Sequence, residues 1–212
     1  MSINELEDEI LKAIKESTIE VFSTMLMIDV NAEDSFVKDE KNVSTDLISS
    51  LHFFGENYMG KIAVFSYGAT ACHLSGSMLG MEMSEVDEDV KDGMGEIVNM
   101  IAGSAKVKLE SSMGDFHLLT PWVIAGRNLS IASPHGSDSD LAIDSQAQFS
   151  WIMTKFSYDK GHFVVGVQPN EVPQSSTSEA EKNISALQDE IEKLKSENAD
   201  LKSTISDAGI AV

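Results

Sequence analysis

The chain has a single cysteine, Cys72. One cysteine excludes an internal disulfide bond and any metal site built from several thiolates. Its neighbours Ala71 and Leu74 are small or apolar, which favours a buried side chain over a reactive thiol. Cys72 is therefore expected to pack in the core rather than to carry chemistry.

Basic residues are scarce, since 15 Lys and Arg stand against 35 Asp and Glu, a formal net charge of -20 in 212 residues. Nucleic acids and anionic membranes bind through clustered Lys and Arg, so we expect neither as a partner. The charge favours a protein partner with a positive rim. The hydrophobic share of 42% predicts a globular chain with one substantial core and an appendage.

Several other signals are missing. No apolar run approaches the roughly 20 residues that a membrane span needs, and no signal peptide precedes the first predicted helix, so a cytoplasmic protein is expected. The sequence has no Gly-x-Ser-x-Gly elbow and no phosphate-binding Gly-Lys-Ser/Thr loop, which leaves serine hydrolases and nucleotidases without support. The histidines are scattered without the i, i+4 spacing of a helical metal site, so no metal site on this chain is expected.

The segment 87–110 carries the pattern most informative about function. At about 100° per residue, a helix here has a polar stripe opposite an apolar face. The stripe consists of Asp92, Glu96, Asn99 and Gly103, and the apolar face of Val90, Met94, Ile97, Ile101 and Ala105. Glu-x-x-Asn spacing alone is common on solvated helices. However, Asn is unfavourable in a helix interior and each Gly costs roughly 1 kcal/mol there, which indicates a partner that needs them.

The order Asp92-x3-Glu96-x2-Asn99 resembles the motif of the CheC/CheX/FliY family of chemotaxis phosphatases, in which an Asp or Ser, a Glu and an Asn share one helix face. Pro121 stands near the place of a proline that follows the motif in that family. The run 60–80 resembles the strand and helix that precede it. The resemblance spans roughly residues 5 to 168, and the single motif points to the CheX branch.

The resemblance implies an enzyme of two-component signalling that hydrolyses the aspartyl phosphate of a CheY-like response regulator. It implies that Asn99 orients the attacking water, while Glu96 pairs with a lysine of the receiver pocket. The partner would contact Asp92, Gly95 and Gly103, and Mg²⁺ would be bound by the receiver domain rather than by this chain.

Two alternatives stay open. The first is general-base catalysis by Glu96. This role would need burial to raise the pKa of the Glu96 carboxyl group toward neutrality, whereas Glu96 is expected on a polar stripe. The second is a non-catalytic dimeric adaptor that binds a receiver domain or a motor component.

A faint echo of the motif, Glu16-x3-Glu20-x2-Ser23, lies in the first predicted helix and reflects either an internal duplication that has lost its Asn or coincidence.

The remaining pattern predicts an α+β fold with two long helices packed on a mainly antiparallel sheet, over residues 1–168. Helices are expected over 3–27, 70–79 and 87–110, the last opened by a capping pair of Ser84 and Asp87. A loop with at most a short strand is expected over 28–42. Strands are expected in a hairpin over 43–54 and 59–67, over 116–125 with Pro121 at an edge or bulge, and in a hairpin over 142–158 and 162–168.

After a flexible polar linker over 169–181, a helix over 182–207 has a coiled-coil seam. Its seam positions are Ile184, Leu187, Ile191, Leu194, Asn198, Leu201 and Ile205. Ile at a, Leu at d and Asn198 at an a position favour two parallel strands. Because so short a seam is marginal alone, we expect a homodimer held by the coiled coil together with contacts between the globular domains.

Overall fold

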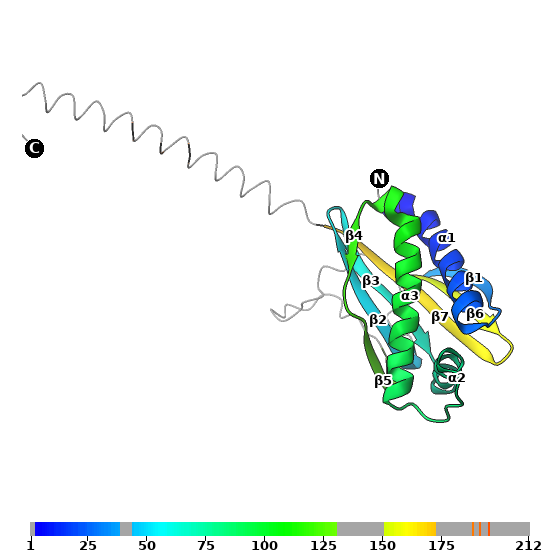
Figure 1. Ribbon diagram of the computed structural model, residues 1–212. Coiled ribbons are helices and arrows are strands. Elements are labelled where there is room, and N and C mark those ends of the chain that lie inside the picture. The colour runs from blue at the N-terminus through cyan, green and yellow to red at the C-terminus, as the bar shows by residue number, and fades with distance from the viewer. Residues whose placement is uncertain are drawn as a thin grey trace, which may run out of the picture. The chain divides into compact units, whose positions relative to one another are not determined.

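The computed structural model describes residues 3–38, 44–130 and 151–172, together with residues 188, 191 and 195. The chain divides into two compact units, residues 1–172 and 173–212. The described part of the first unit is a seven-stranded sheet with helices on it (Figure 1). In the second unit, the described residues Gln188, Ile191 and Lys195 are helical.

Neighbouring strands of the sheet are antiparallel throughout the described residues. The strands are β1 (Asn31–Lys38), β2 (Ser44–Gly55), β3 (Tyr58–Ser66), β4 (Phe116–Leu118), β5 (Trp122–Ser130), β6 (Trp151–Tyr158) and β7 (Gly161–Glu171). Their order is β1-β6-β7-β3-β2-β4, and β5 also pairs with β2. The first half of β2 therefore pairs with β5 and its end with β4.

One face of the sheet is covered by helices (Figure 1). They are α1 (Ile3–Val21), which continues as a π-helical turn η1 (Phe22–Leu26), α2 (Gly68–Leu79) and α3 (Glu88–Met113). The main core lies between this face and the helices, where strand alternation points Leu47, Leu51 and Phe53 of β2 inward, all at most 3% exposed. The predicted α+β class with a mainly antiparallel sheet is confirmed, and the described residues of the first unit form three α-helices.

Helix boundaries follow local signals. The left-handed Gly80 ends α2, as predicted, and Met27 at φ 55° ends η1. Helix α3 begins later than a Ser84 cap would require, because the N-cap is Asp87 itself, whose Oδ1 accepts from the Val90 amide at 3.0 Å. The capping role assigned to Ser84 is therefore wrong.

The prediction of a loop over 28–42 is wrong for β1, an eight-residue strand that pairs with β6. Its acidic sequence has no sustained alternation, and its pairing partner lies more than a hundred residues away in the chain. Local pattern does not report such a pairing, since an edge strand gains its hydrogen bonds from a distant segment.

The predicted strand over 116–125 is two strands, β4 and β5, with Pro121 between them rather than within a strand. Because proline has no amide hydrogen, it cannot donate to β2 at this point, and the ladder is interrupted there. Both hairpins are confirmed in the described residues, and β7 continues past residue 168 to Glu171. Residues 142–150 of the predicted strand over 142–158 and the coiled coil over 182–207, except for three of its residues, lie outside the described part.

Candidate functional site

Helix α3 presents its apolar face to the core, as the sequence predicts. Val90, Met94, Ile97, Ile101 and Ala105 are all 0% exposed. On the opposite side Asp92 and Glu96 are exposed, and Asn99 and Gly103 are half-buried. The polar stripe of α3 is therefore open to a partner over three helical turns.

Glu96 and Asn99 lie together on this stripe. The Asn99 Nδ2 donates to Glu96 Oε2 over 3.4 Å, a long and weak hydrogen bond. Because this contact is weak, both side chains can exchange it for groups of a partner. A carboxylate and an amide, both directed outward one turn apart, can bind a cation and orient a water molecule.

The glycines of α3 differ in their surroundings. At Gly103 an added Cβ would meet no atom within 4 Å, so this part of the stripe is open. Gly95, predicted to contact the partner, is instead buried, and its Cβ position lies 3.7 Å from Val123 Cγ2 of β5. At Gly93 a Cβ would lie 2.8 Å from Ser75 Cβ, so this glycine lets α2 approach α3 closely. Gly93 and Gly95 thus belong to the interior.

Two buried serines that the sequence analysis did not single out fix the orientation of α3. Ser49 Oγ of β2 donates to the Met94 carbonyl at 2.7 Å, and Ser75 Oγ of α2 donates to the Val90 carbonyl at 2.9 Å. The two carbonyls lie one turn apart on α3, so the bonds oppose rotation of the helix about its axis. The only signal in the sequence is a hydroxyl at an otherwise apolar position.

Pro121 stands two residues before Val123, the residue that lies against Gly95. Strand β5 therefore borders the motif half of α3 on one side. Helix α1 borders α3 on the other side, where the echo of the motif lies.

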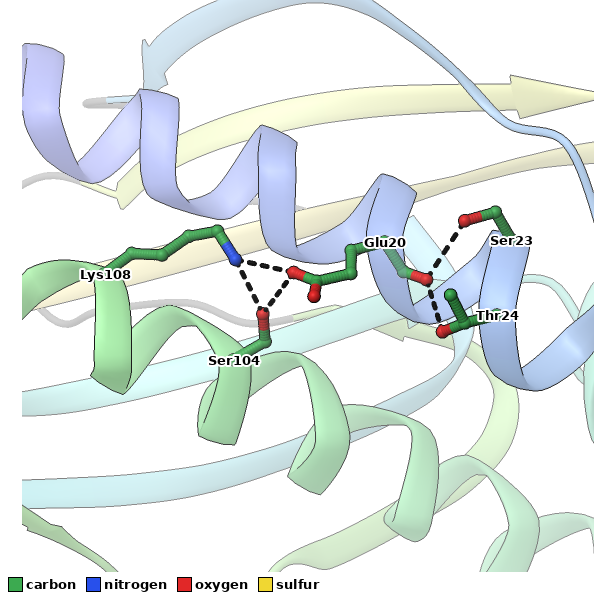
Figure 2. Close-up of polar contacts among 5 residues, drawn as sticks. All are labelled: Glu20, Ser23, Thr24, Ser104 and Lys108. Carbon is green, nitrogen blue, oxygen red and sulfur yellow. Dashed lines mark hydrogen bonds and ion pairs between the residues drawn. The ribbon is translucent and has the colours of Figure 1, made fainter.

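In that echo, the carboxylate of Glu20 is already bound. Figure 2 shows Lys108 and Ser104 of α3 converging on it: Lys108 Nζ donates to Glu20 Oε2 at 2.6 Å and Ser104 Oγ at 3.0 Å. Ser23 Oγ donates to the Glu20 backbone carbonyl at 3.1 Å. The hydrogen bond from Lys108, the hydrogen bond from Ser104 and the positive charge of Lys108 together hold the pKa of Glu20 below its ordinary value. Glu20 thus links two helices, in contrast to Glu96, whose hydrogen bond in the described residues comes from its neighbour Asn99.

Among the described residues, no three His, Cys, Asp or Glu side chains are grouped to hold a metal ion. Cys72 is buried, and burial raises the pKa of its thiol, which disfavours the reactive thiolate. In the same part of the chain, no helix is both long and apolar enough to cross a membrane.

Known proteins match most of the first unit. Residues 48–143 match the family model of the chemotaxis phosphatase CheX. The CheY-P phosphatase CheX of Thermotoga maritima is 27% identical over 128 residues, which cover 60% of this chain and 83% of that protein.

Solved structures give the same result. The chemotaxis protein CheX from Desulfovibrio desulfuricans superposes with a TM-score of 0.63 at 28% identity, over 76% of this chain and 99% of that one. A chain of the CheX–CheY–BeF3–Mg²⁺ complex from Borrelia burgdorferi, at 20% identity, shares the fold with a TM-score of 0.58, over 76% of this chain and 97% of that one. The chain is therefore similar in sequence and in fold to the CheC/CheX/FliY family, and to its CheX branch in particular.

Proposed function

We propose that this protein hydrolyses the aspartyl phosphate of a CheY-like response regulator and that Glu96 and Asn99 enter the regulator's active site. The observation that carries the proposal is that these two side chains lie together on the outer side of α3. The hydrogen bonds from Ser49 and Ser75 to the α3 backbone oppose rotation of this helix. The name of the Thermotoga maritima relative, CheY-P phosphatase, supports the substrate. The Borrelia burgdorferi complex supports a CheY partner.

In the proposed reaction, a water oxygen forms a bond to phosphorus while the bond from phosphorus to the aspartate oxygen breaks. The products are inorganic phosphate and a free aspartate, and the water proton leaves with solvent or phosphate. Asn99 positions the water, since its amide oxygen accepts from water and its nitrogen donates to a phosphoryl oxygen. Positioning of this kind can supply several kcal/mol of barrier reduction. The Mg²⁺ that offsets phosphoryl charge is held by the receiver domain in this proposal.

Glu96 anchors the partner by pairing with the lysine of the receiver pocket. General-base catalysis by Glu96 is less well supported, because an effective carboxylate base is usually buried and Glu96 is exposed. A Glu96→Gln change would separate the roles. Anchoring predicts weaker binding with an unchanged single-turnover rate at saturating protein, whereas a base role predicts a lower rate even at saturation.

The direct test is the decay of a phosphorylated receiver domain with Mg²⁺, measured as phosphate release. We expect wild-type protein to accelerate decay, and Asn99→Ala to lose most of that acceleration, roughly a hundredfold for a misplaced reacting group. Asn57→Ala, at an exposed asparagine between β2 and β3, is the matched control and should keep full activity. Equal decay with and without wild-type protein would leave the non-catalytic adaptor.

A further inference from the structure

The sole arginine of this acidic chain, Arg127 of β5, lies in a hollow beside the start of α3. The hollow has a volume of about 720 Å³ and is lined by residues near the beginnings of β2, α2 and α3 and by residues of β5. Its lining residues are Asp46, Gly68, Val86, Lys91, Ala125, Gly126 and Arg127. Two cations thus face one carboxylate in a molecule whose net charge is -20.

The described charges around the hollow form contacts with groups other than Arg127. The carboxylate of Asp46 accepts from the Gly68 amide at 3.2 Å. Lys91 Nζ contacts Glu88 Oε1 at 2.6 Å, but the Glu88 side chain is 85% exposed, so this ion pair is worth little and can exchange. Among the described residues, no carboxylate forms an ion pair with the exposed guanidinium of Arg127.

The hollow lies close to the motif. Lys91 precedes Glu96 by five residues, which is about 7.5 Å along a helix axis. Val123 of the same strand as Arg127 lies against Gly95, so β5 flanks the motif on the side of the hollow. Asn99 follows Lys91 by eight residues, which is about 12 Å along the helix axis. A typical protein interface covers about 800 Å² on each partner, which is wider than this separation.

We propose that this hollow binds a carboxylate side chain of the receiver domain and that Arg127 determines this contact, with Lys91 adding charge. The inference rests on the proposed function for the identity of the partner. A guanidinium presents a planar pair of donors that matches a carboxylate, which suits a directional contact at the rim of an interface. A receiver that binds Glu96 and Asn99 would make a second contact at Arg127. The two contacts together would determine the orientation of the receiver over α3.

The test uses the full chain and a receiver domain loaded with beryllofluoride, which mimics the phosphorylated state without being hydrolysed. Arg127→Glu should weaken binding by roughly five- to tenfold, as expected for a partly solvated charge contact turned repulsive, and should reduce the dependence of affinity on salt. The matched control is Lys12→Glu on α1, whose side chain is 76% exposed and which makes the same change in net charge. It should bind within about twofold of the wild type.

A charge exchange makes the test specific. Surface carboxylates of the receiver are replaced by lysine one at a time, and one replacement should restore binding to Arg127→Glu while weakening binding to the wild type. Because Arg127 is exposed, the variant should keep its thermal midpoint, which separates lost contact from lost fold. Three outcomes would each overturn the proposal. Arg127→Glu could bind the receiver as tightly as the wild type does, Lys12→Glu could weaken binding as much as Arg127→Glu does, or no lysine replacement in the receiver could restore binding to Arg127→Glu.

The two proposals can fail separately. If the wild type binds the loaded receiver and Arg127→Glu weakens binding but phosphate release is not accelerated, the docking contact stands and the phosphatase does not. If Asn99-dependent hydrolysis is observed and Arg127→Glu binds as the wild type, the docking contact fails alone. If the wild type does not bind the loaded receiver, the docking contact also fails.

Discussion

The glycines of α3 lie in environments that give opposite expectations for substitution. At Gly103 a methyl group meets nothing within 4 Å, whereas at Gly93 it would lie 2.8 Å from Ser75 Cβ and Oγ, in a buried contact between helices. Gly103→Ala should therefore raise the free energy of unfolding by about 1 kcal/mol, the gain in helix propensity. Gly93→Ala should lower it by about 1–3 kcal/mol through overpacking.

Urea denaturation of both variants measures this difference. Gly103→Ala should also weaken receiver binding if the stripe is the docking face, since a methyl group would then stand between α3 and the partner. A destabilised Gly103→Ala variant, or a Gly93→Ala variant as stable as the wild type, would contradict the packing described for α3.

At this scale the helical period was enough to predict which side of α3 faces the core and that Glu96 and Asn99 point outward. The reason for Gly93 could not be predicted, because it depends on Ser75 of another helix. The burial of Gly95 under β5 was likewise invisible, since the position of β5 is set by pairing with β2.

Helices α1 and α3 are joined through the carboxylate of Glu20, and the strength of this link depends on pH. The pKa of Glu20 in the folded protein lies below its ordinary value of 4.5, because the charged form accepts hydrogen bonds from Lys108 and Ser104. A lowered carboxyl pKa contributes stability above the unfolded pKa, and the contribution is lost as pH falls through the folded one. Glu20→Gln should therefore lower the thermal midpoint at neutral pH, and the difference should vanish in acid.

Thermal midpoints of both proteins across this pH range measure the effect. Glu16→Gln is the control, since Glu16 lies one turn earlier on α1 and its ion pair among the described residues is with Lys12, at 4.0 Å on the surface. It should show little pH-dependent difference from the wild type. A Glu20→Gln difference that persists unchanged below the folded pKa would exclude the charged carboxylate as its source.

Elements were predictable where their signal is local. The hairpins of β2 with β3 and of β6 with β7, and the end of α2 at Gly80, follow alternation and turn residues along a continuous stretch. Strand β1 has no local signal because its partner β6 is remote in the chain. For Pro121 the sequence predicts an edge or a bulge within one strand, whereas the structure has a break between β4 and β5. The second helix, α2, was placed correctly, but nothing local indicated that its Ser75 would contact α3.

For the molecule as a whole, the described sheet and its helices belong to residues 1–172, and the predicted coiled coil to residues 173–212. We propose that the full chain is a homodimer through this second unit. The full chain should then have twice its monomer mass by light scattering at micromolar concentration, while a chain of residues 1–172 should show a smaller dimer fraction. The shorter chain should still unfold in a cooperative thermal transition, since it keeps every described strand.

A monomeric mass for residues 1–212 would remove the dimer. If the chain of residues 1–172 forms a dimer as stable as that of the full chain, the dimer contact lies in the globular unit instead. Composition favours a protein partner over nucleic acid. It does not reveal that the only arginine lines a hollow together with Lys91 of α3, because the position of Arg127 depends on the pairing of β5 with β2.

The bonds from Ser49 and Ser75 to α3 also bear on how a phosphorylated receiver could be told from an unphosphorylated one. A helix fastened at two successive turns has little freedom to adapt its shape when it meets a partner. Under the proposed function, the phosphorylated and unphosphorylated receivers would then be distinguished by a conformational change of the receiver. This protein would keep its own conformation and bind the activated conformation of the receiver.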